Sequence, residues 1–86
     1  MDWQEVLDVG RSDAAHRRQE ASVQRADAAE CAAEAKNATD ADTSVLWLMR
    51  AMQQRSAAAS SNAASDISDS IADHAQDVLE HLDPDS

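Results

Sequence analysis

The side chains best suited to metal or acid–base chemistry lie near the C-terminal end of the chain. His74, Asp77 and His81 are spaced so that a helix would place them along one face. Imidazole and carboxylate groups are ordinary ligands of zinc and related metals. However, residues seven apart on a helix stand about 10 Å apart along its axis, too far for a single ion. We interpret these residues as solvated side chains and expect neither a metal nor another cofactor.

Two further patterns suggest reactive or binding sites. Segment 40–44 begins like a calcium loop, but Val45 and Ala51 stand where such a loop has its glycine and its bidentate glutamate. Cys31 is the only cysteine, and the only histidine in its half of the chain is the distant His16. We therefore predict a helix cap at 40–42 and a small packed residue at Cys31. No catalytic residue is predicted, and the chain is not expected to be an enzyme.

The composition allows only a thin hydrophobic core. The chain has 86 residues, with five Val, five Leu, two Ile and no Phe, and its net charge is −10. A short chain of this composition often cannot bury enough apolar surface to offset the entropy lost on ordering. We therefore expect a single small domain over 1–86 that gains stability from a second chain, either as a homo-oligomer or with another protein partner.

Charge and apolar patterning argue against several classes of protein. Binding to nucleic-acid phosphates needs clustered Lys and Arg, so direct nucleic-acid binding is not expected. The longest apolar run, 45–49, has five residues against the roughly 20 that span a bilayer. The N-terminal residues lack the basic and apolar regions of a signal peptide, which favours a cytoplasmic location or export by a signal-peptide-independent system. No small-molecule substrate is expected, because no cofactor motif or pocket-forming fold is visible.

Helix is the only regular structure that the composition favours. No Gly or Pro occurs between Arg11 and Asp83, and Ala is abundant. Turn-forming residues at 37–42 predict an all-α helical hairpin of two long helices, about 3–36 and 43–82, with coiled-coil-like packing. Asp2 is the predicted cap of the first helix, and Asp40 or Asp42 that of the second.

Three weaker signals modify this outline. Gly10 predicts fraying or a slight bend in the first helix. Ser- and Asn-rich residues 60–66 could kink or break the second helix. Pro84 cannot continue a helix, so a short disordered tail is predicted over 83–86.

An alanine ladder at seven-residue spacing is the most specific pattern. Its members are Leu7, Ala14, Ala21, Ala28 and Ala35. Acids stand immediately before the four alanines of the ladder, and arginines stand four residues after Leu7, Ala14 and Ala21. This is the charge arrangement that pairs helices in coiled coils. Small side chains at this spacing let two helices approach closely, although Arg17 and Gln24 interrupt the adjoining row. The partner is either the second helix of the same chain, which we favour, or a helix of another copy.

Large apolar side chains of the second helix form further candidate contacts. At 100° per residue, Val45, Leu48, Met49 and Met52 share one face, and Trp47 points to nearly the opposite side. We expect the shared face to pack inside the hairpin and Trp47 to anchor an intermolecular contact, or else to lie partly exposed over a neighbouring turn. A later stripe, at spacings of three and four, contains Ile67, Ile71, His74 or Ala75, Val78 and Leu82. The residues predicted to form interfaces are Ala14, Ala21, Ala28, Ala35, Val45, Trp47, Leu48, Met49, Met52, Ile67, Ile71 and Val78.

Charge is unevenly divided along the second helix. Residues 43–65 carry Arg50 and Arg55 and no acid, whereas residues 66–86 carry seven acids and no base. Complementary zones of this kind favour staggered packing between subunits. The predicted function is that of a non-enzymatic interaction protein, an acidic hairpin that self-assembles or docks as a subunit of a larger assembly. The alternative is an acidic decoy whose carboxylates mimic nucleic-acid phosphates toward a basic partner.

In its length and its Ala-, Ser- and Gln-rich composition, the chain resembles the small helical hairpins that form bacterial secretion needles. Those subunits usually have a Pro-bounded turn, whereas here the turn is predicted at 37–42 and the only Pro is Pro84. The resemblance is one of composition, and it implies a repeated subunit of a secretion-type or filamentous assembly.

Overall fold

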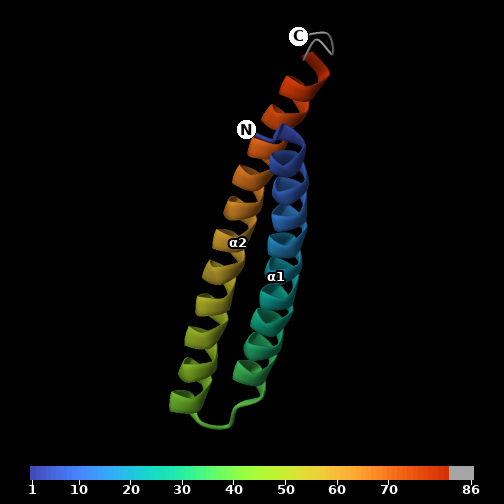
Figure 1. The fold of residues 1–86 in the computed structure, drawn as a ribbon. Helices are drawn as coiled ribbons and strands as arrows, with labels where there is room; N and C mark the ends of the chain where they lie inside the picture. The colour runs from blue at the N-terminus through green and yellow to red at the C-terminus, as the bar shows by residue number, and fades with distance from the viewer. Residues whose placement is uncertain (82–86) are drawn as a thin grey trace.

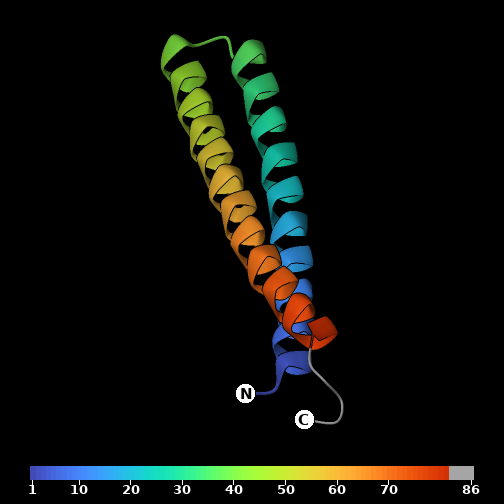
Figure 2. The same cartoon turned by 90° about the horizontal axis from the view of Figure 1, so that it is seen from above.

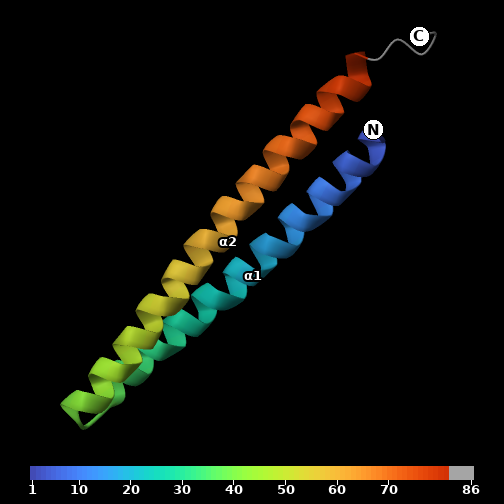
Figure 3. The same cartoon turned by 60° about the vertical axis from the view of Figure 1, so that its left-hand side comes forward.

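Two long antiparallel helices make up the fold (Figure 1). The computed structural model describes residues 1–81, with α1 at Trp3–Asn37 and α2 at Ala41–His81. The predicted all-α hairpin is confirmed, and the predicted helix bounds agree to within about two residues. The helices run alongside each other and wind around each other, so that they overlap near the open end in Figure 2 and near the interhelical turn in Figure 3. The Cα trace extends 71 × 14 × 13 Å. The predicted end of the second helix near residue 82 and the predicted tail at 83–86 lie outside the described residues.

Carboxylate caps begin both helices. Asp2 Oδ1 accepts a hydrogen bond from the Glu5 N–H at 3.1 Å. Asp40 Oδ2 accepts from the N–H and the hydroxyl of Thr43, at 3.2 and 3.0 Å. These bonds satisfy first-turn N–H groups that have no partner within the helix. Asp40 is therefore the cap of α2, and Asp42, the alternative, lies inside its first turn.

The serine-rich segment does not interrupt α2, which continues through residues 60–66. Ser61 and Ser65 are buried against α1. The Ser61 hydroxyl donates to Gln24 Oε1 at 3.0 Å, and the Ser65 hydroxyl donates to the Asn62 carbonyl at 2.8 Å. Because these small side chains fit between the helices with their hydroxyls satisfied, the predicted break does not occur.

Small residues form the buried contact between the helices, which we call the seam. Its buried members are Gly10, Ala14, Ala21, Ala28, Cys31 and Ala35 in α1, and Ala51, Ala58, Ser61, Ser65, Ala72 and Ala75 in α2. In both helices these positions keep the seven-residue spacing of a single narrow stripe. The partner of the alanine ladder is therefore α2 of the same chain.

Gly10 leaves little room for a side chain in the seam. A Cβ atom added there would lie 3.0 Å from the Ala72 Cβ and 3.1 Å from the Ser68 carbonyl oxygen. The glycine lies within uninterrupted helix, where fraying or a bend was predicted. Its missing side chain is what permits the helices to approach so closely at this point.

Candidate assembly interface

The large apolar side chains at the start of α2 lie outside the seam. Val45, Leu46, Leu48, Met49 and Met52 are between 47 and 66% exposed. They occupy about two turns of α2 close to the interhelical turn, and we call them the loop-end patch. Full burial of such a side chain is worth about 1.5–3 kcal/mol. The patch therefore holds a considerable driving force for association that the hairpin itself does not use.

Trp47 lies on the seam side of α2, so the predicted inner and outer faces are inverted. Its ring is half-buried and lines a cavity together with Cys31 and Glu34 of α1. The Arg50 guanidinium carbon lies 5.9 Å from the ring centroid. Trp47 stands one turn before the buried Ala51, so the stripe that buries Ala51 also brings Trp47 toward α1. The loop-end patch, most of which was the predicted inner face, points outward as a result.

The later apolar stripe of α2 is divided between the seam and the surface. Ala75 is buried, Val78 is half-buried, and Ile67 and Ile71 are 63 and 52% exposed. The two isoleucines were predicted as contact residues, but the helix contact there is made by the smaller side chains of the seam. They therefore remain available to another molecule.

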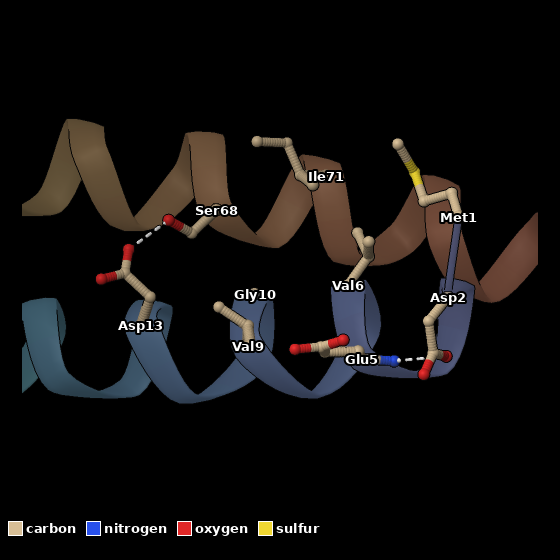
Figure 4. Close-up of a pocket in the computed structure, with 9 residues that line it drawn as sticks. All are labelled: Met1, Asp2, Glu5, Val6, Val9, Gly10, Asp13, Ser68 and Ile71. Atoms are coloured by element: carbon tan, nitrogen blue, oxygen red, sulfur yellow. Dashed lines mark hydrogen bonds between the residues drawn. The ribbon is translucent and has the colours of Figure 1, made fainter.

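A groove lies at the open end of the hairpin, opposite the interhelical turn (Figure 4). It has a volume of about 460 Å³, and its lining includes Glu5, Val6, Val9, Asp13, Ser68 and Ile71. Valine and isoleucine side chains from both helices form its walls, and carboxylates stand along its α1 side. The groove was not predicted from the sequence, because its two walls come from opposite ends of the chain.

Asp13, in the lining of the groove, is hydrogen-bonded to α2. Its carboxylate accepts a hydrogen bond from the Ser68 hydroxyl, and this bond lowers the pKa of Asp13 below its ordinary value of 3.8. Partial burial opposes the effect, and Arg17, whose Nε lies 3.3 Å from Asp13 Oδ2, reinforces it. Asp13 is therefore ionised and internally paired at neutral pH.

Ion pairs link the helices on the side of the seam that carries the α1 arginines. Arg11 lies 3.2 Å from Asp69 and 2.8 Å from Asp73, and Arg18 also pairs with Asp69. On the other side, Arg50 Nε lies 3.9 Å from an Asp27 oxygen. Exposed pairs of this kind contribute about 0–1 kcal/mol each. They favour the observed alignment of the helices more than they add to stability.

The residues considered for chemistry are engaged in structural contacts. The His74 ring packs edge-on against Trp3, with 5.7 Å between the ring centroids, and Cys31 is buried, at 2% exposed. A hydrogen bond with the Asp77 carbonyl, helped by the Asp77 charge, raises the pKa of His81. Across residues 1–81, no three His, Cys, Asp or Glu side chains are grouped to hold a metal ion. No helix in that range is both long and apolar enough to cross a membrane.

Comparison of the chain with protein-family models, curated proteins and solved structures finds no match.

Proposed function

We propose that this chain is a non-enzymatic structural protein, a helical hairpin that associates with further copies of itself as a subunit of a larger assembly. The observation that carries the proposal is that small side chains are buried between the helices while large apolar side chains lie on the surface. The seam contains Ala, Ser, Gly and Cys, whereas the loop-end patch gathers five large apolar side chains on the surface. Contiguous exposed apolar patches are uncommon on monomeric proteins and mark surfaces that bind other molecules.

The energetics of the seam support the same conclusion. Each buried Ala contributes one methyl group, worth about 0.8 kcal/mol. Ordering the backbone costs about 1–2 kcal/mol for every residue. A seam made mainly of such residues leaves a small margin of stability, and burial of the loop-end patch against another copy would increase it.

Internal pairing of the carboxylates weighs against the decoy alternative. A decoy must present free carboxylates to a basic partner. Here Asp69 is paired with Arg11 and Arg18, and Asp13 with Arg17 and Ser68. The arginines of α1 therefore neutralise part of the acidic surface that a decoy would need.

Sedimentation velocity over a range of micromolar concentrations tests the proposal. We expect the wild-type chain to show concentration-dependent association. The double variant Met49→Ser/Met52→Ser should keep its helical circular dichroism but associate about tenfold more weakly or less, because it loses apolar area at the patch.

A matched control makes similar changes on the same outer face of α2. Ala59→Ser/Ala63→Ser alters two exposed positions, one and two heptads further along, and should associate like the wild type. A wild-type chain that stays monomeric throughout the range, with a cooperative thermal transition, would overturn the proposal.

A further inference from the structure

Two surfaces of the hairpin complement each other in charge and in apolar character. The first contains the loop-end patch and two arginines, Arg25 of α1 and Arg55 of α2. The second is the open-end groove, whose apolar walls carry the carboxylate of Glu5. Within residues 1–81, neither arginine lies within ion-pairing distance of a carboxylate, and the same is true of Glu5 with respect to cations.

Within the described residues, Arg25 and Arg55 have no carboxylate partner. Arg25 and Arg55 occupy positions equivalent to those of Arg11 and Asp69, which form an ion pair nearer the open end. Here both members are cations, and like charges at positions equivalent to an ion pair are unfavourable. The position therefore does not stabilise the hairpin, and carboxylates from another molecule would relieve the repulsion.

One chain cannot bring its own two surfaces together. On α1, Arg25 beside the patch follows the seam residue Ala21 by four positions, whereas Asp13 beside the groove immediately precedes the seam residue Ala14. The patch and the groove therefore lie on opposite sides of the seam. Along the axis, Val9 of the groove and Ala29, which lies level with the patch, are about 30 Å apart at 1.5 Å per residue. The complementary surfaces must therefore meet between different molecules.

We infer that the loop-end patch of one copy, flanked by Arg25 and Arg55, docks into the open-end groove of the next copy. The inference rests on the proposed self-assembly and specifies its geometry. Each copy uses one surface and leaves the other free, so the contact is heterologous and propagates head to tail. Large side chains of the patch fill the apolar groove, and the two arginines approach the carboxylate of Glu5 on its α1 side.

Two blocked variants test the geometry. Met52→Glu/Arg55→Glu blocks the patch and leaves the groove intact. Glu5→Lys/Val9→Lys blocks the groove and leaves the patch intact. All four positions are exposed, so both variants should retain the helical circular dichroism of the wild type. Each variant alone should associate at least about tenfold more weakly than the wild type, because its chains lack one half of every contact.

An equimolar mixture of the two variants separates the possible geometries. Head-to-tail docking predicts a dimer containing one copy of each variant and nothing larger, because only one functional patch and one functional groove can meet. Sedimentation velocity and native mass spectrometry would identify this species. A mixture that stays monomeric would overturn the inference. Continued association of the groove-blocked variant alone would point to patch-on-patch contact and would overturn the inference as well, as would continued association of the patch-blocked variant alone.

A control variant and the wild-type chain distinguish a failure of the docking geometry from a failure of the proposed self-assembly. Ser60→Glu/Ala63→Glu adds charge at exposed positions of α2 outside both surfaces and should associate like the wild type. Loss of association in this control would show that net charge, and not docking, governs assembly, which would overturn the inference. A monomeric wild type would contradict self-assembly itself.

Discussion

The hydrogen bond between Ser68 and Asp13 gives one carboxylate a measurable role in stability. Because the folded-state pKa of Asp13 lies below its ordinary value of 3.8, folding favours the ionised form. The resulting stabilisation is fully present above about pH 3.8 and is lost as the pH falls through the lower folded-state value. The bond thus makes the open end of the hairpin sensitive to acid.

Removing the hydroxyl should abolish most of this shift. In Ser68→Ala, we expect the pKa of Asp13 to rise toward 3.8, as followed by NMR of its carboxyl group. The variant should be less stable than the wild type at neutral pH, and the difference should shrink in acid. Ser70→Ala is the control, because the Ser70 hydroxyl bonds the Asp66 carbonyl and no carboxylate. An unchanged Asp13 titration in Ser68→Ala would contradict this assignment.

At Gly10, steric fit outweighs helix propensity. Gly10→Ala should gain about 1 kcal/mol of helix propensity. It should lose about 1–3 kcal/mol from overpacking against Ala72 and the Ser68 carbonyl. We expect a net loss of about 1 kcal/mol in urea denaturation.

The same substitution in an Ala72→Gly background provides the check. There the added methyl group no longer meets the Ala72 Cβ, although the Ser68 carbonyl remains close. Gly10→Ala should therefore cost less in this background than in the wild type. An equal cost in both backgrounds would mean that the contact with Ala72 does not limit the approach of the helices.

At the scale of the helices, adjacent alanines of α1 should respond very differently to enlargement. Ala28 is buried in the seam, whereas Ala29 is exposed. Ala28→Leu should destabilise the hairpin by about 1–3 kcal/mol, because the added volume pushes α2 away. Ala29→Leu should stay within about 0.5 kcal/mol of the wild type. A higher melting temperature for Ala28→Leu, without a change of oligomeric state, would show that the seam is not closely packed.

The orientation of α2 predicts opposite effects for Trp47 and Met52. Trp47→Ala should cost about 2 kcal/mol of stability, roughly half the loss for a fully buried aromatic side chain. Met52→Ala should change stability by less than about 0.5 kcal/mol and weaken association instead. Circular dichroism during denaturation and sedimentation on the same samples would separate the two effects. The reverse outcome would restore the face assignment expected from the sequence.

At the scale of the whole molecule, salt distinguishes local attraction from general repulsion between copies. The net charge of −10 opposes association, and charge pairs between Arg25 or Arg55 and the groove favour it. At about 0.1 M salt the Debye length is near 10 Å, so repulsion between distant charges is already largely screened. We therefore expect association to weaken from about 0.1 to about 0.5 M NaCl in sedimentation experiments. Stronger association at high salt would show that net repulsion dominates.

The sequence by itself determined the features that depend on neighbouring residues. The helices follow from abundant Ala and the lack of Gly and Pro over most of the chain, and both caps depend on bonds spanning three residues. The alanine ladder could be recognised because its spacing is regular within one helix. The small side chains of the ladder also predicted that the partner helix approaches closely. The hairpin and much of the seam were therefore predictable.

Only the tertiary structure decided how α2 is rotated about its axis, and with it which side chains face outward. Apolar residues surround the first turns of α2, so hydrophobicity favours placing the largest of them inside. The observed rotation instead aligns the small residues of α2 with the ladder of α1 over the whole length of the hairpin. Close approach at pairs such as Gly10 and Ala72 allows no large side chain in the seam. That fit depends on residues far apart in the chain, and it leaves the loop-end patch and the open-end groove on the surface.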